Sequence, residues 1–104
     1  MKRYIRKVID DKHYLEIEVA HRDGAYRVYF SQYTRLDDSG LVEMYPFAEG
    51  NFTVKMGIGR KSEKKLDKIR NYLEEKADSI FLLWQDKQYQ GIADSLFSFW
   101  HSLG

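Results

Sequence analysis

The chain has 104 residues, a length that suits one domain and is short for two domains with separate cores. Hydrophobic residues make up 43% of it, charged residues make up 32%, and the formal net charge is +1, so the composition supports a packed core and excludes a chain that its own charge holds unfolded. Because there is no cysteine, disulfides, thiolate metal sites and a cysteine nucleophile are excluded as well.

The first half of the chain has the alternating hydrophobicity that is typical of strands. From this pattern we expect strands near residues 3–9, 13–22, 25–35, 41–46 and 51–58. Between the second and third strands, Asp23-Gly24 has the composition of a two-residue hairpin turn. A turn there pairs Val19 with Val28 and places Ile17 opposite Phe30 on the same face. The hydrophobic sets of the two strands then agree in register.

A second turn is expected at Asp10-Asp11-Lys12, before the hairpin. With a three-residue loop, Ile5 lies opposite Ile17 on the hydrophobic face. On the other face Arg6 lies opposite Glu16, a favourable pairing of charges. Together the strands predict a five-stranded, mainly antiparallel meander sheet with one apolar face.

The hydrophobic spacing becomes helical after about residue 60. Ser62 is a good helix N-cap, and hydrophobic residues follow it at spacings of three and four: Leu66, Ile69, Leu73, Ala77 and Ile80. The pattern leaves open whether residues 62–88 form one helix or two. A final helix carries Ile92, Leu96, Phe99, Trp100 and Leu103 on one side. We predict a single two-layer α+β domain over 1–104, in which two or three C-terminal helices within 62–103 cover one face of a sheet within 3–58.

A basic segment surrounds the start of the first predicted helix. Residues 51–70 contain seven lysines and arginines against two acidic residues, a net charge of +5. We call Arg60, Lys61, Lys64, Lys65 and Lys68 the basic helix start. Like charges four residues apart, and cations at the positive end of a helix dipole, both destabilise a helix. The segment therefore suggests contact with phosphates. The alternative is a lysine face that is simply exposed to solvent and binds no ligand.

Tyrosines and arginines gather on the polar face of the predicted sheet. The candidate binding residues there are Tyr4, Tyr14, Arg27, Tyr29, Tyr33 and Arg35. Such residues stack on nucleobases, contact proteins, or occur simply because tyrosine is a good strand residue. Glu16 and Glu18 lie on the same face, and their negative charges would repel the phosphates of nucleic acid. Binding of a protein partner is therefore the favoured function of this face.

Catalytic and metal-binding patterns are weak. His13 and His21 lie eight residues apart on one predicted strand, roughly 26 Å at ~3.3 Å per residue, so they cannot share a metal ion. Asp37 and Asp38 stand where turns favour aspartate, which leaves a small metal-dependent hydrolase as a distant third alternative. The glycines and cations of residues 57–62 match neither a P-loop nor a dinucleotide fingerprint. We expect no enzyme activity, no cofactor and no metal.

The longest hydrophobic run, residues 80–84, is far shorter than the ~20 residues that span a bilayer. The basic N-terminus is not followed by a signal-peptide core, so we expect a cytoplasmic protein without a membrane partner. Because the run is hydrophobic on all sides of a helix, residues 80–100 are expected mostly in the core, with a homodimer interface as the alternative.

These features predict a small, non-catalytic module that binds a macromolecule. The favoured partner is nucleic acid or another polyanion, held through the basic helix start by contacts that position phosphates without reading sequence. The alternative is a protein-binding adaptor or inhibitor that uses the tyrosine-rich face.

Overall fold

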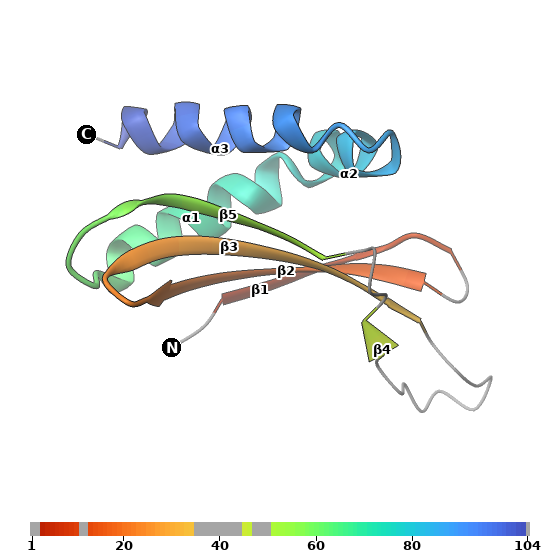
Figure 1. Cartoon of the computed structure of the whole chain (residues 1–104), viewed down its shortest axis with the longest axis horizontal. Coiled ribbons are helices and arrows are strands. Elements are labelled where there is room, and N and C mark those ends of the chain that lie inside the picture. The colour runs from red at the N-terminus through yellow and green to blue at the C-terminus, as the bar shows by residue number, and fades with distance from the viewer. Residues whose placement is uncertain (1–2, 11–12, 35–44, 47–50, 104) are drawn as a thin grey trace.

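The computed structural model describes residues 3–10, 13–34, 45–46 and 51–103, which form a mixed α+β fold (Figure 1). Four long strands build an antiparallel sheet: β1 (Arg3–Val8), β2 (His13–Arg22), β3 (Ala25–Thr34) and β5 (Phe52–Ile58). Three helices follow: α1 (Glu63–Glu75), α2 (Ala77–Gln85) and α3 (Tyr89–Ser102). The helices lie on one side of the sheet, which confirms the predicted two-layer class (Figure 1).

The β2–β3 hairpin has the predicted register. Val19 pairs with Val28 and Ile17 pairs with Phe30, and all four side chains are buried. On the other side of β2, Ile5 of β1 lies opposite Ile17, also as predicted. The alternation of the sequence thus places the hydrophobic residues of three strands on the face that the helices cover.

Both predicted turns use aspartate for a local reason. Asp23 and Gly24 have φ angles of 54° and 75°, which a two-residue type I′ hairpin turn requires. In the earlier turn, the Asp10 carboxylate accepts a hydrogen bond from the His13 backbone N–H at 2.9 Å. These aspartates therefore have structural roles that account for their position.

The expected five-stranded meander is wrong in its strand order. β5 pairs directly with β3, from Ala25 opposite Ile58 to Phe30 opposite Phe52. β4 (Tyr45–Pro46) has only two residues and pairs with the far end of the same edge of β3, while residues 41–44 lie outside the described residues. The ten residues of β3 are enough to pair with both segments along one edge, so the body of the sheet has four strands.

The region 62–88 forms two helices, which answers the question that the sequence left open. Ser62 caps α1 as predicted, because its hydroxyl accepts a hydrogen bond from the Lys65 backbone N–H at 3.2 Å. α1 ends at Glu75, Lys76 caps it, and α2 runs from Ala77 to Gln85. A turn with Lys87 at a φ of 57° then leads into α3.

The core lies between the sheet and the helices. Phe30 is completely buried and packs against Phe52 and Trp84, with ring centroids 5.7 and 5.8 Å apart. Gly57 lets α3 approach β5 closely, since a Cβ atom at this position would lie 2.2 Å from the Trp100 ring. Both tryptophans therefore contribute to the packing between the two layers.

Most of the hydrophobic residues in the region 80–100 belong to the core or pack against it, as expected. Ile80 and Trp84 are buried, whereas Leu82 is 61% exposed and Phe97 is 38% exposed. Those two exposed side chains are compatible with a homodimer through residues 80–100, which stays a prediction. None of the described helices is long and hydrophobic enough to cross a membrane.

Candidate polyanion interface

The basic helix start lies at the end of the fold where the β2–β3 turn, the β5–α1 connection and the end of α3 come together (Figure 1). Three hydrogen bonds fix the connection. The Gly59 N–H donates to the Gly24 carbonyl at 3.0 Å, and the Tyr26 hydroxyl donates to the Arg60 carbonyl at 2.5 Å. The His21 ring nitrogen Nε2 lies 2.7 Å from the Gly59 carbonyl. The backbone before α1 is therefore anchored to the hairpin.

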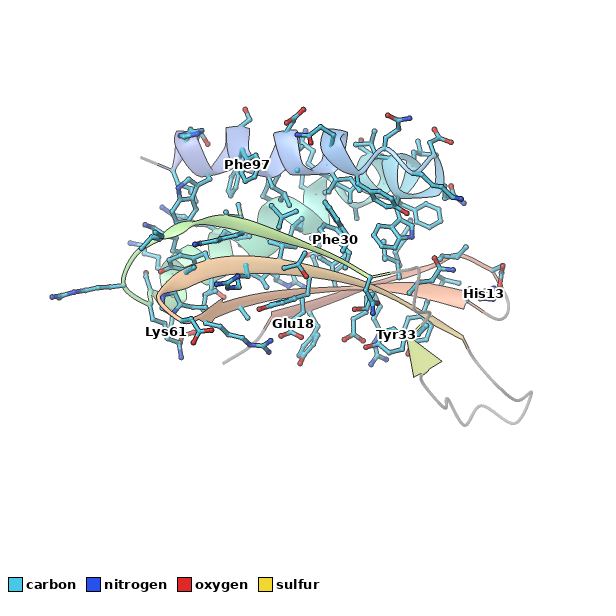
Figure 2. All side chains as sticks on the ribbon, in the orientation of Figure 1. His13, Glu18, Phe30, Tyr33, Lys61 and Phe97 are labelled. Carbon is cyan, nitrogen blue, oxygen red and sulfur yellow. The ribbon has the colours of Figure 1, made fainter. Side chains whose placement is uncertain are left out.

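Four cations of the basic helix start are exposed, namely Arg60, Lys61, Lys64 and Lys68. Lys61 lies 3.6 Å from the Glu63 carboxylate, and Figure 2 shows Lys61 at this end of the molecule. Within the described part of the chain, Lys64 and Lys68 form no ion pair. Together with the exposed Arg60, these two side chains are the cations of the basic helix start that are most available to a ligand.

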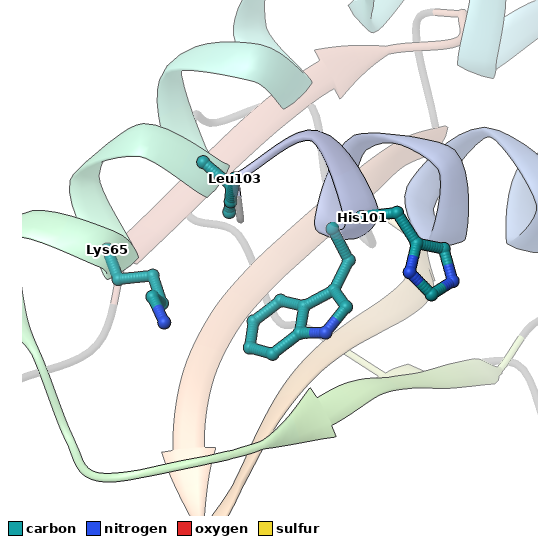
Figure 3. Close-up of a pocket in the computed structure, with 4 residues that line it drawn as sticks. Lys65, His101 and Leu103 are labelled. Atoms are coloured by element: carbon teal, nitrogen blue, oxygen red, sulfur yellow. The ribbon is translucent and has the colours of Figure 1, made fainter.

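Lys65 differs from the other lysines of the basic helix start. Its ammonium nitrogen lies 5.1 Å from the centroid of the Trp100 ring and 5.6 Å from that of Tyr26. Such cation–π contacts stabilise a partly buried lysine. With Trp100, His101 and Leu103, Lys65 also lines a cavity of about 250 Å³ (Figure 3). Lys65 therefore takes part in packing α1 against α3, a role that its place in the sequence did not indicate.

The end of α3 compensates part of the positive charge. Leu103, the C-cap of α3, shares a second cavity of about 140 Å³ with Ser62, Lys64, Lys65 and Lys68. A helix C-terminus carries the negative end of the helix dipole, so the lysines at the start of α1 lie beside partial negative charge. The fold thus supplies a structural reason for these lysines, in addition to any ligand.

Two further cations lie on the adjoining part of the sheet. Arg27 of β3 is the cross-strand partner of Lys55 of β5, and like charges in such positions destabilise a sheet. Neither forms an ion pair with a carboxylate among the described residues. From the sequence, Arg27 was grouped with the tyrosines and Lys55 was counted only in the charge of residues 51–70, because only the β3–β5 pairing brings the two together.

The open sheet face is the face turned away from the helices, and it carries Tyr4, Tyr14, Tyr29 and Tyr33. Figure 2 shows Tyr33 and Glu18 on this side and Phe30 on the side of the helices. The rings of Tyr14 and Tyr33 stack, with centroids 5.5 Å apart and planes 17° apart. Burial raises the pKa of the Tyr14 hydroxyl, which has no hydrogen-bond partner in the described structure.

Both glutamates of the open sheet face are paired with arginines. Glu16 lies 3.4 Å from Arg6, which is the cross-strand pairing that the sequence predicted, and Glu18 lies 2.6 Å from Arg22. The Arg22 guanidinium also lies 4.9 Å from the centroid of the Tyr29 ring. Each negative charge of this face therefore has a positive charge beside it. The repulsion of nucleic-acid phosphates that the sequence led us to expect is weakened accordingly.

Some of the predicted residues cannot be placed in this geometry. Arg35, Asp37 and Asp38 lie outside the described residues. Among the residues that the structure describes, histidines and carboxylates form no group of three that could hold a metal ion.

No protein-family model, curated protein or solved structure shows a significant match to this chain. The function is therefore inferred from the two surfaces themselves, the basic helix start and the open sheet face.

Proposed function

We propose that the chain is a non-catalytic, cytoplasmic binding module that contacts nucleic acid or another polyanion through the basic helix start. The observation that carries this proposal is the accumulation of exposed cations at one end of the fold. Lys64 and Lys68 have no ion-pair partner in the described structure, and the pair Arg27 and Lys55 extends the positive charge onto the sheet.

The repulsion between lysines at this end of the fold favours a ligand that supplies negative charge. Lys61 with Lys65 and Lys64 with Lys68 are like-charge pairs four residues apart, each destabilising by ~0.2–0.5 kcal/mol. The α3 C-terminus offsets this only in part, since a helix end carries about half an elementary charge. A polyanion supplies the remaining countercharge and releases its own condensed counterions on binding.

Protein binding through the open sheet face is the second candidate function. Tyrosine and arginine are enriched in protein interfaces, and Tyr4 is 47% exposed on this face. This candidate does not use the basic helix start, so the salt dependence of binding distinguishes the two.

The proposal is tested by titrating the chain with a labelled single-stranded oligonucleotide and with heparin between about 50 and 200 mM salt. With about four phosphate contacts, we expect the logarithm of the binding constant to fall with the logarithm of salt at a slope near −3. An affinity that is indifferent to salt, or the absence of binding to both polyanions, would contradict the proposal.

A further inference from the structure

We infer that the open sheet face binds the bases of a single-stranded nucleic acid, with one base held in a hollow lined by Tyr4, Arg6, Glu16 and Tyr33. The inference rests on the proposed function and specifies which polyanion the chain takes. The hollow has a volume of about 440 Å³, within the range of small-ligand pockets. It opens on the face that none of the described helices covers.

Two aromatic rings border the hollow from different strands. Tyr4 belongs to β1 and is substantially exposed, so its ring is free to receive a base. Tyr33 belongs to β3, and its ring stacks on the ring of Tyr14. Aromatic side chains on a sheet stack with any base, because every base presents a π face. The pair of rings therefore suits a flat aromatic ligand.

The polar groups of the hollow complement the edge of a base. The Arg6 side chain is 57% exposed, so it retains N–H donors beyond its ion pair with Glu16. The Glu16 carboxylate accepts hydrogen bonds, and an exocyclic amino group such as that of cytosine is a suitable donor. One donor and one acceptor beside two rings match a nucleobase better than they match an aliphatic side chain.

The hollow lies on the same sheet as two of the cations near the basic end. Glu16 pairs with Ser31 on β3, and Arg27 lies four residues along the same strand, roughly 14 Å away at ~3.4 Å per residue. Arg27 and its neighbour Lys55 lie between the hollow and the basic helix start along the sheet. A strand with a base in the hollow can therefore place its phosphates near these cations.

The geometry favours a single strand over a duplex. In a duplex the bases are stacked and paired, so a base enters a hollow of this kind only after it has been flipped out. In a single strand the bases are free to stack on protein rings while the phosphates follow the positive charge. The ion pairs Arg6–Glu16 and Arg22–Glu18 reduce the repulsion that the glutamates would otherwise exert on phosphates.

The experiment compares two probes of equal charge: an oligodeoxycytidine of about 12 nucleotides, and an abasic strand with the same number of phosphates. The native chain should bind the cytidine strand more tightly. Tyr4→Ala should reduce the affinity for the cytidine strand by about 5- to 100-fold and leave the salt slope unchanged, since stacking involves no counterion release. The abasic strand should bind native chain and variant alike.

Phe97→Ala is the matched control, because it removes an exposed aromatic ring from the helical layer. Tyr4→Leu guards against a loss of folding, since leucine keeps the hydrophobic contacts of β1 but lacks a ring that stacks; it should act in the same direction. Equal affinity of the native chain for the cytidine and abasic strands would overturn the inference and leave the proposed function standing. Tighter binding of a duplex of the same length would overturn it too, whereas no binding of any probe would overturn both.

Discussion

Replacing Lys64 and Lys68 together with glutamine should weaken polyanion binding roughly 25- to 60-fold at about 0.1 M salt. Each phosphate contact contributes about 0.7–0.9 to the salt slope, so two lost contacts should make the slope shallower by about 1.4–1.8. Both side chains are exposed and form no ion pair in the described structure, so within the fold they lose only the weak attraction of the α3 C-terminus. Fluorescence anisotropy over a salt series measures both quantities.

The same double variant should be as stable as the native chain or slightly more stable. It relieves a like-charge pair of ~0.2–0.5 kcal/mol at the positive end of the α1 dipole. The control is Lys76→Gln with Lys87→Gln, an equal charge change beyond the C-terminal ends of α1 and α2, which should leave binding nearly unchanged. A loss of stability in the Lys64 and Lys68 variant would mean that these lysines serve the fold. We expect such a loss only for Lys65→Gln, because Lys65 packs against two rings.

Replacing Phe30 with alanine should lower the free energy of unfolding by about 3–5 kcal/mol. Phe30 is fully buried between the layers and contacts Phe52 and Trp84, so the shortened side chain leaves a cavity that both layers border. Because a domain of this size is stable by only about 5–15 kcal/mol, the variant will be close to unfolding. Urea denaturation followed by tryptophan fluorescence measures the change.

Phe97→Ala is the matched control for this variant, since Phe97 is partly exposed on α3. Its effect should be much smaller, because little of the ring leaves a packed environment. Equal losses for the two variants would show that Phe30 is not the centre of the core.

The parts of the fold that could be predicted are those that short-range chemistry determines. A two-residue turn at Asp23-Gly24 fixes the pairing of every residue in the β2–β3 hairpin, and the alternation of side chains then determines the buried face. The start of α1 follows from the capping hydroxyl of Ser62 and the hydrophobic spacing after it. These signals lie within a few residues of the structure that they specify.

The remainder depends on contacts between distant segments. That β5 pairs directly with β3 could not be read from alternation, because alternation specifies a face and not a neighbouring strand. The same pairing creates the Arg27–Lys55 pair. The role of Lys65 required knowing that Trp100 of α3 lies beside it.

The candidate sites were predictable to different degrees. The basic helix start was visible in the sequence as a cluster of positive charges. The hollow between Tyr4 and Tyr33 was not visible there, because it is formed by β1 and β3, which are separated by β2. The compensation of Glu16 was predicted from its cross-strand partner Arg6, but that of Glu18 was not, because its partner Arg22 lies on the same strand.

The most direct measurement of where a polyanion binds is an amide chemical-shift map, recorded while a single-stranded oligonucleotide is added to isotope-labelled chain. We predict the largest shifts in residues 60–68, with further shifts near Arg27, Lys55 and the hollow of the open sheet face, and little change in α2. Shifts confined to α2 and the exposed side of α3, or no shifts at oligonucleotide concentrations that saturate binding, would contradict the assignment of the basic helix start as the polyanion interface.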